Sequence, residues 1–133
     1  MTWGQTARFG SCERGSSAVE LAVVAPAFFG LVFGIIFVGM ILWTQASLHF
    51  AAQSAARCAA INTGVCNSST TIQNYALSRY YGLSVGGTNP FTYSATGCGN
   101  TVTASYAYTL TIPFAGTRSV PLSARACFPS PPS

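Results

Sequence analysis

The residue types that serve catalysis are scarce in this chain of 133 residues. His49 is the only histidine, both acidic residues are glutamates, and the sequence contains no aspartate or lysine. A Ser/His/Asp triad therefore cannot be assembled. No pair of titratable groups in the C-terminal half could divide the roles of acid and base. The sequence predicts that the protein is not an enzyme, with no catalytic residue and no cofactor.

Cysteine is the one reactive residue type that recurs in the sequence. Cys12 precedes a long apolar run, and four cysteines follow it, an even number that suits an oxidising compartment. The spacings match no zinc site, so no metal is predicted. Three pairings of the four are possible. We favour Cys58–Cys66, which would tie the end of a long helix to the next loop, and Cys98–Cys127, which would join the loop before a hairpin to its last strand.

Glu20 stands at the head of the apolar run, where a carboxylate is costly in a membrane and needs a reason. One reason is local, because a glutamate in the first turn interacts favourably with the helix dipole and Ser16 or Ser17 could cap the helix. The residue types alone leave open whether Glu20 has this local role or a functional one.

The composition points to a chain that spends part of its length in lipid. Half of the residues are hydrophobic and only 6% are charged, against about 25% in an ordinary soluble domain. Disorder is excluded too, because it requires low hydrophobicity and high charge. The net charge of +4 comes from scattered arginines, which do not form the clustered basic face of a nucleic-acid-binding protein. No nucleic-acid partner is predicted.

Residues 21–43 form an uninterrupted apolar run that predicts a membrane span. As a helix the run would rise about 34 Å, enough to cross a hydrocarbon core of about 30 Å. It is longer than the apolar region of a secretory signal peptide, although Ala46, Ala51 and Ala52 keep a cleavable signal open as an alternative. Arg8 and Arg14 precede the run, so the positive-inside rule leaves the N-terminus in the cytoplasm.

Small residues mark the faces of the helix that could pack closely. Gly30 and Gly34 form a small-xxx-small pair after Pro26, which removes one backbone donor. The helix is expected to continue to about residue 62 through an alanine-rich segment. One stripe of that segment suits tight packing against other helices or against the chain's own domain, and it consists of Ala51, Ala55 and Ala59.

The remaining residues predict a small α+β domain. A short helix is expected from a cap at Thr70 or Thr71 to about Tyr81, ended by Gly82. Strict alternation predicts an antiparallel hairpin of strands 101–113 and 119–128, with a turn at 115–117 flanked by Pro113 and Pro121. A weaker strand is expected near 91–94, and the aromatic residues between 75 and 93 are expected mainly in the core.

The N-terminal pattern is similar to that of a known family. Residues 14–26 read RGSSAVELAVVAP and residues 51–60 read AAQSAARCAA. Together they resemble the TadE-like minor pilins, or pseudopilins, of the Tad/Flp type IV pilus system, with Leu21 where that family often carries Tyr or Phe. The resemblance implies a class III signal peptide, which a prepilin peptidase cuts between Gly15 and Ser16 and which leaves Glu20 as the fifth residue of the mature chain.

The resemblance also implies a structural role. The new amine of Ser16 would pair with Glu20 of the same or a neighbouring subunit, while Gly30, Gly34 and the alanine stripes would pack subunits together. The implied partners are membrane lipid, other pilin or minor pilin subunits, the prepilin peptidase and the pilus assembly platform. The implied location is the bacterial inner membrane, single pass, with a cytoplasmic N-terminus, a periplasmic C-terminal domain and incorporation into an extracellular pilus.

The expected organisation is a leader at 1–15, a long helix at 16–62 and a small disulfide-bonded α+β domain at 63–133. Two other interpretations stay open. The chain could be an unprocessed bitopic membrane protein whose outer domain binds a partner, or a secreted β-rich domain whose signal is removed near residue 45.

Overall fold

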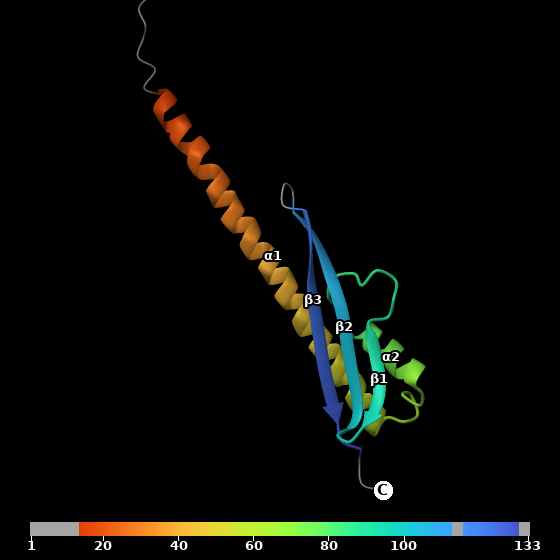
Figure 1. Ribbon diagram of the computed structural model, residues 1–133. Helices are drawn as coiled ribbons and strands as arrows, with labels where there is room; N and C mark the ends of the chain where they lie inside the picture. Colours follow the sequence, from red (N-terminus) through yellow and green to blue (C-terminus); the bar gives the residue numbers. More distant parts are fainter. Residues whose placement is uncertain (1–13, 113–115, 131–133) are drawn as a thin grey trace, which may run out of the picture. The chain divides into compact units, whose positions relative to one another are not determined.

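A computed structural model describes residues 14–112 and 116–130. The described residues divide into two units, with the boundary between Phe37 and Val38. The elements of the second unit are α+β in class, with a long helix, a short helix and a three-stranded antiparallel sheet (Figure 1). The predicted fold class is confirmed, whereas the leader boundary at Gly15 depends on processing and stays a prediction.

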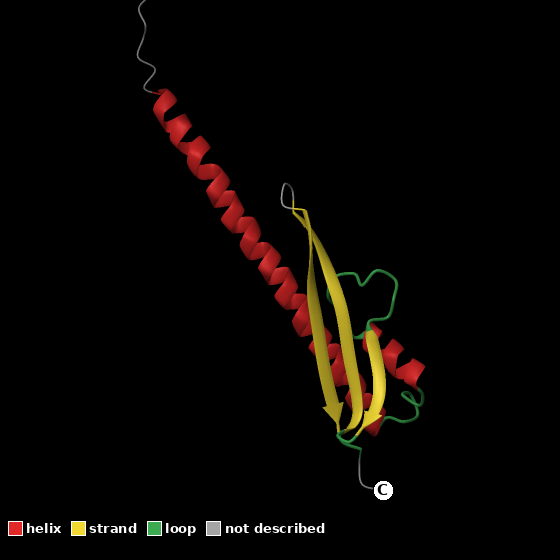
Figure 2. Ribbon diagram, viewed as in Figure 1, coloured by secondary structure: helices red, strands yellow, loops and turns green. Residues whose placement is uncertain are grey.

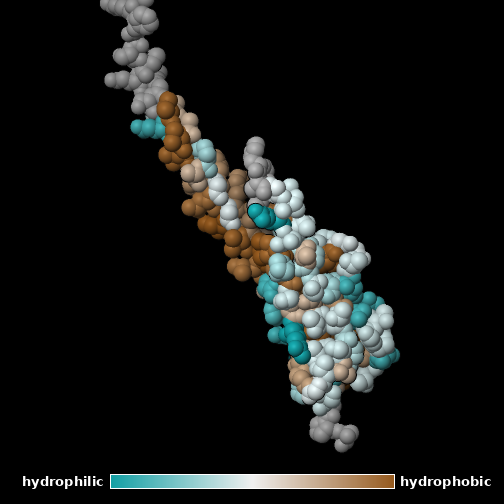
Figure 3. Space-filling model, in the orientation of Figure 1, coloured by the Kyte–Doolittle hydropathy of each residue, from teal (hydrophilic) through white to brown (hydrophobic). Residues whose placement is uncertain are grey.

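Helix α1 covers Arg14–Ile61 and continues through Pro26. The part of α1 in the first unit has no hydrophobic core, since none of the side chains described between residues 17 and 37 is buried. The most apolar window of the helix has a mean hydropathy of 2.6 and is wholly unburied. Figure 3 shows this apolar surface along the N-terminal part of α1. Among the described helices, α1 alone has the length and hydropathy of a single-pass membrane anchor.

The second half of α1 lies against the sheet in the outer unit, residues 38–133 (Figure 2). Alanines line the buried face of this part of the helix. Ala51 and Ala55 are 0% exposed and Ala59 is 8% exposed. They pack with Leu48, Phe91 and residues of the sheet in one hydrophobic core. Their burial here does not support the expectation that these alanines pack neighbouring subunits together, which stays a prediction. Their small side chains serve the alternative that the sequence left open, which is close packing of the helix against its own domain.

Helix α2 covers Ser69–Ser78 and begins with a capping box. The Ser68 hydroxyl accepts the Thr71 amide at 3.3 Å, and the Thr71 hydroxyl accepts the Ser68 amide at 3.0 Å. The predicted cap at Thr70 or Thr71 is thus displaced to Ser68, whose extended backbone suits a cap. The predicted end near Tyr81 is also wrong, because α2 stops at Ser78 and the following residues turn to meet α1.

The sheet has the order β1-β2-β3 with antiparallel neighbours, and α2 lies beside β1 (Figure 1). Its strands are β1 at Phe91–Thr96, β2 at Gly99–Ile112 and β3 at Gly116–Phe128. Side chains alternate between the two faces of the sheet. On the buried face, Val102 is paired with Ala126 and Ala104 with Ala124. The predicted hairpin and the weaker first strand are confirmed, with β1 two residues longer than expected.

Two details of the hairpin differ from expectation. Pro121 lies inside β3, opposite Ala107, rather than beside the turn. It is tolerated there because β3 is an edge strand, where a missing backbone donor matters least. Gly116 starts β3 with a φ of 82°, which only glycine adopts without strain. Pro113 and Ala115, which the sequence assigned to the turn and its flank, fall outside the described residues.

Two disulfides close the outer unit. Cys58 is bonded to Cys66, with 5.9 Å between their α carbons, and Cys98 to Cys127, with 6.3 Å. These are the two pairings that the sequence favours. The first holds the last turn of α1 to the loop before α2, and the second holds the β1–β2 turn to the end of β3. Cys12 lies outside the described residues.

The alanine face yields a stability prediction. Ala55→Leu inserts three carbon atoms at a fully buried site, so we expect it to lower the free energy of unfolding by about 1–3 kcal/mol. Urea unfolding of the full chain in detergent, followed by near-UV circular dichroism, measures this change. Gln53→Leu on the exposed face is the control and should shift stability by no more than about 0.5 kcal/mol. Equal effects of the two substitutions would contradict the packing described.

Candidate functional site

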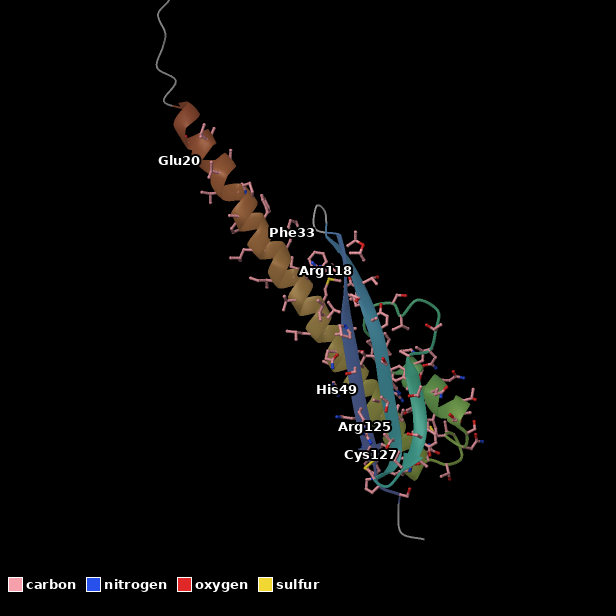
Figure 4. The ribbon with its side chains drawn as sticks, in the orientation of Figure 1. Glu20, Phe33, His49, Arg118, Arg125 and Cys127 are labelled. Atoms are coloured by element: carbon pink, nitrogen blue, oxygen red, sulfur yellow. A yellow bond between two sulfur atoms is a disulfide. The ribbon has the colours of Figure 1, made fainter. Side chains whose placement is uncertain are left out.

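The residues of the predicted processing site lie at the start of α1. Gly15 and Ser16 fall within its first turn, so the helix begins before the position at which Ser16 or Ser17 was expected to cap it. Glu20 is one turn beyond Ser16 and is exposed (Figure 4). Residues four apart on a helix are neighbours on one face, about 6 Å apart along the axis. A free amine on Ser16 would therefore be within ion-pairing reach of the Glu20 carboxylate.

Beyond Glu20, three small residues lie one helical turn apart from one another. Pro26, Gly30 and Gly34 are spaced by four residues and lie in one row. All three are exposed, and a β carbon added to either glycine would meet nothing within 4 Å. Because Ala51, Ala55 and Ala59 are buried in the outer unit, these three are the only predicted helix-packing residues that remain open among the described positions.

The loop after α2 is fastened to α1 by polar contacts that the sequence did not reveal. The Tyr81 amide donates to the Ser47 hydroxyl at 2.7 Å, and the Trp43 indole donates to the Tyr81 carbonyl at 3.1 Å. One turn earlier, the buried Thr44 hydroxyl accepts the Leu83 amide at 3.4 Å. The sequence did contain one indication of these contacts, which is the pair of hydroxyls of Thr44 and Ser47, one turn apart on an otherwise apolar helix face. They fix the loop where the apolar run of α1 ends.

Two phenols hold the same loop from the side of the sheet. Tyr80 donates to the Leu83 carbonyl, and Tyr106 donates to the Ser84 carbonyl at 2.8 Å. Burial raises the pKa of Tyr80, and the nearby Tyr106 adds to this increase. Tyr80 therefore remains a neutral donor. The expectation of a core role suits Phe91, which is 1% exposed, but not Tyr81, which is 65% exposed.

The side chains able to bind metals are dispersed or already used. Within the described ranges, no three His, Cys, Asp or Glu side chains come together. Four of the cysteines are in disulfides. His49 is exposed on α1, with its Nε2 atom 3.2 Å from the Gln45 amide nitrogen (Figure 4). That amide donates to the Ser123 carbonyl of β3, so the histidine belongs to a helix–sheet contact.

The contact between Ser47 and the loop can be tested by amide exchange. Ser47→Ala removes the acceptor of the Tyr81 amide, and we expect that amide to exchange about tenfold faster. Hydrogen–deuterium exchange of the full chain in detergent measures this rate. Ser94→Ala, at an exposed serine of β1, is the control and should leave the Tyr81 amide unchanged. An unaltered rate in Ser47→Ala would show that the hydrogen bond does not hold the loop.

Comparison with known proteins identifies the N-terminal part of the chain. The model of one family, described as TadE-like protein, matches residues 15–57. No curated protein and no solved structure matches the chain. The matched segment contains Gly15, Ser16, Glu20 and the row from Pro26 to Gly34, and it ends in the alanine face below the sheet. Over residues 15–57 the chain is TadE-like, which is the family that its sequence pattern resembles.

Proposed function

We propose that the protein is a minor pilin, or pseudopilin, of a Tad/Flp pilus, with a structural rather than an enzymatic role. The observation that carries this proposal is the TadE-like match over residues 15–57. The described structure supports it with an apolar helix that has no core of its own and a small outer unit at its C-terminal end. A prepilin peptidase processes the chain after Gly15, and the product takes part in pilus assembly or initiation.

The chemistry of assembly follows from the cut. Cleavage between Gly15 and Ser16 leaves a positive amine one helical turn from the Glu20 carboxylate. Either charge alone is costly in lipid, and pairing them removes most of that cost. When the carboxylate of one subunit pairs with the amine of another, the pair also sets how far the two helices are shifted along their axes.

The apolar surface of α1 supplies the contacts between subunits. In the membrane this surface meets lipid, and in an assembly it meets the helices of neighbouring subunits. Pro26, Gly30 and Gly34 form the open row where another helix can approach most closely. The subunit begins in the bacterial inner membrane, crosses it once with its N-terminus in the cytoplasm, and places the outer unit in the periplasm. Its partners are the prepilin peptidase, the assembly platform and other pilin subunits.

Processing gives the first test. We expect the chain isolated from membranes to begin at Ser16, because the peptidase recognises the small residue before the cut. Intact-mass spectrometry without reducing agent measures the N-terminus and both disulfides together. Gly15→Leu should keep the leader, whereas Gly15→Ala should still be cut. A wild-type chain that begins at Met1 would replace the proposal with the unprocessed bitopic protein, and a start beyond Trp43 would replace it with a secreted domain.

Glu20 gives the second test. Glu20→Ala removes the carboxylate that pairs with the Ser16 amine, so we expect membrane insertion and processing to persist while assembled pili are lost. Recovery of sheared filaments measures assembly, and membrane fractionation measures insertion. The matched control is Glu13→Gln, which changes an acidic residue inside the leader and should not affect assembly. Normal piliation in Glu20→Ala would refute the pairing role.

A further inference from the structure

The charges of the chain are segregated to an unusual degree. Both glutamates lie at or before residue 20, and residues 21–133 contain four arginines without a single acidic side chain. These arginines are Arg57, Arg79, Arg118 and Arg125, and all four are exposed. None of them can form an ion pair with a side chain of the outer unit. Any acidic side chain that they meet must come from outside the outer unit.

Three of the four arginines gather around the C-terminal end of α1. Arg57 and Arg79 line one hollow of about 390 Å³, together with the polar side chains of Ser54, Asn62 and Tyr75. Arg57 also lines a second hollow of about 600 Å³, in which Arg125 of β3 takes part (Figure 4). We call Arg57, Arg79 and Arg125 the arginine surface. Arg118, nearer the start of β3, lines neither hollow.

One guanidinium of this surface is held in place before any ligand arrives. The Arg79 Nη2 atom donates to the Tyr75 hydroxyl at 3.2 Å, and its guanidinium carbon lies 5.1 Å from the centre of the Tyr75 ring. This stacking leaves the other guanidinium nitrogens free for an anion. A fixed guanidinium binds a carboxylate through two parallel hydrogen bonds at a smaller cost in side-chain entropy.

The membrane surface is too far away to supply that anion. Arg57 follows Trp43 by fourteen residues on the same helix, a rise of about 21 Å. The headgroup zone on one side of a bilayer is only about 5–8 Å thick. If the hydrocarbon ends where the apolar run ends, lipid phosphates lie well below Arg57.

A second copy of the chain is an equally poor partner. Its outer unit would present the same four arginines and no acidic side chain, so two copies that meet through this surface would repel each other. The complementary partner is a protein surface with clustered Asp or Glu side chains. We propose that the arginine surface docks an acidic patch on the outer domain of a different subunit. This inference rests on the proposed function, because it identifies the kind of subunit that the chain assembles with.

A binding assay with a defined probe tests the inference. The full chain in neutral detergent is titrated against a fluorescent peptide of six glutamates separated by glycine and serine, and anisotropy reports binding. We expect binding that weakens as salt rises, and a loss of about tenfold in the Arg57→Gln, Arg79→Gln double variant. Arg118→Gln removes one charge outside the arginine surface and should change affinity by less than about twofold. Arg79→Lys keeps the charge without the planar fork and should fall between the two.

Several outcomes would overturn the inference. They are no binding of the peptide, an equal loss in Arg118→Gln, or tighter binding of an oligonucleotide of the same charge. Binding of phosphatidylglycerol vesicles that the double variant abolishes would assign the surface to lipid instead. Unfolding curves of each variant are compared with wild type, so that a folding defect is not read as lost binding.

A second experiment identifies the partner in cells. A photo-crosslinking residue at Asn62, in the first hollow, is compared with one at exposed Asn74 on α2, outside both hollows. We expect Asn62 alone to crosslink to an acidic peptide of another subunit, and crosslinks to a second copy of this chain would overturn the inference. The double variant should still begin at Ser16. A chain that begins at Met1 would refute the pilin proposal. The peptide assay would still show whether the arginine surface binds acidic side chains.

Discussion

The close contact between the alanine face of α1 and the sheet is the constraint on which the outer unit depends. Alanine side chains supply the helix side of this core, and small residues on the strands, Ala104, Ala124 and Ala126, supply much of the sheet side. Little room is left for large side chains, and Phe91, Leu48 and Val102 are the largest apolar ones that are fully buried. A core this thin gains much from covalent closure, and disulfides typically contribute about 2–4 kcal/mol each.

The same helix carries two opposite surfaces in succession. Up to Phe37 none of its described side chains is buried, as suits lipid or other helices, and from Thr44 onward one face is buried under the sheet. The helix surface changes from fully unburied to half covered over about two turns, and at the end of this stretch Trp43 is exposed and Thr44 is buried. Electrostatics follow the same division, with the described carboxylate at one end of α1 and the arginine surface at the other.

Much of the fold could be predicted because its determinants are local. The apolar run, the alternating strands and the even set of four cysteines each depend on neighbouring residues or on simple counting. The alanine stripe was different, because a smooth helix face suits a sheet and a second helix equally well. Only the chain that folds over Ala55 decides between them. The docking of Tyr81 on Ser47 joins residues 34 positions apart, and spacing alone does not indicate such a contact.

The candidate site divides in the same way. Gly15, Ser16 and Glu20 could be singled out only through a family pattern, since the chemistry proposed for them needs a cut and a new amine that the uncut sequence does not display. The arginine surface needed the fold, because Arg57 lies on α1, Arg79 directly follows α2 and Arg125 lies on β3. Its decisive property, the absence of acidic residues after Glu20, was nevertheless present in the composition.

The Cys58–Cys66 bond would also affect how the chain responds to a pulling force along α1. It closes the C-terminal end of α1, while the hydrogen bonds that Thr44 and Ser47 accept and that Gln45 donates fasten the other end of the same helical segment. A force along α1 would therefore shear the whole contact between the alanine face and the sheet at once, rather than peel the helix from the sheet at one end. Many weak contacts then share the force at once. A helix that is drawn out of a bilayer would bring its outer unit along intact.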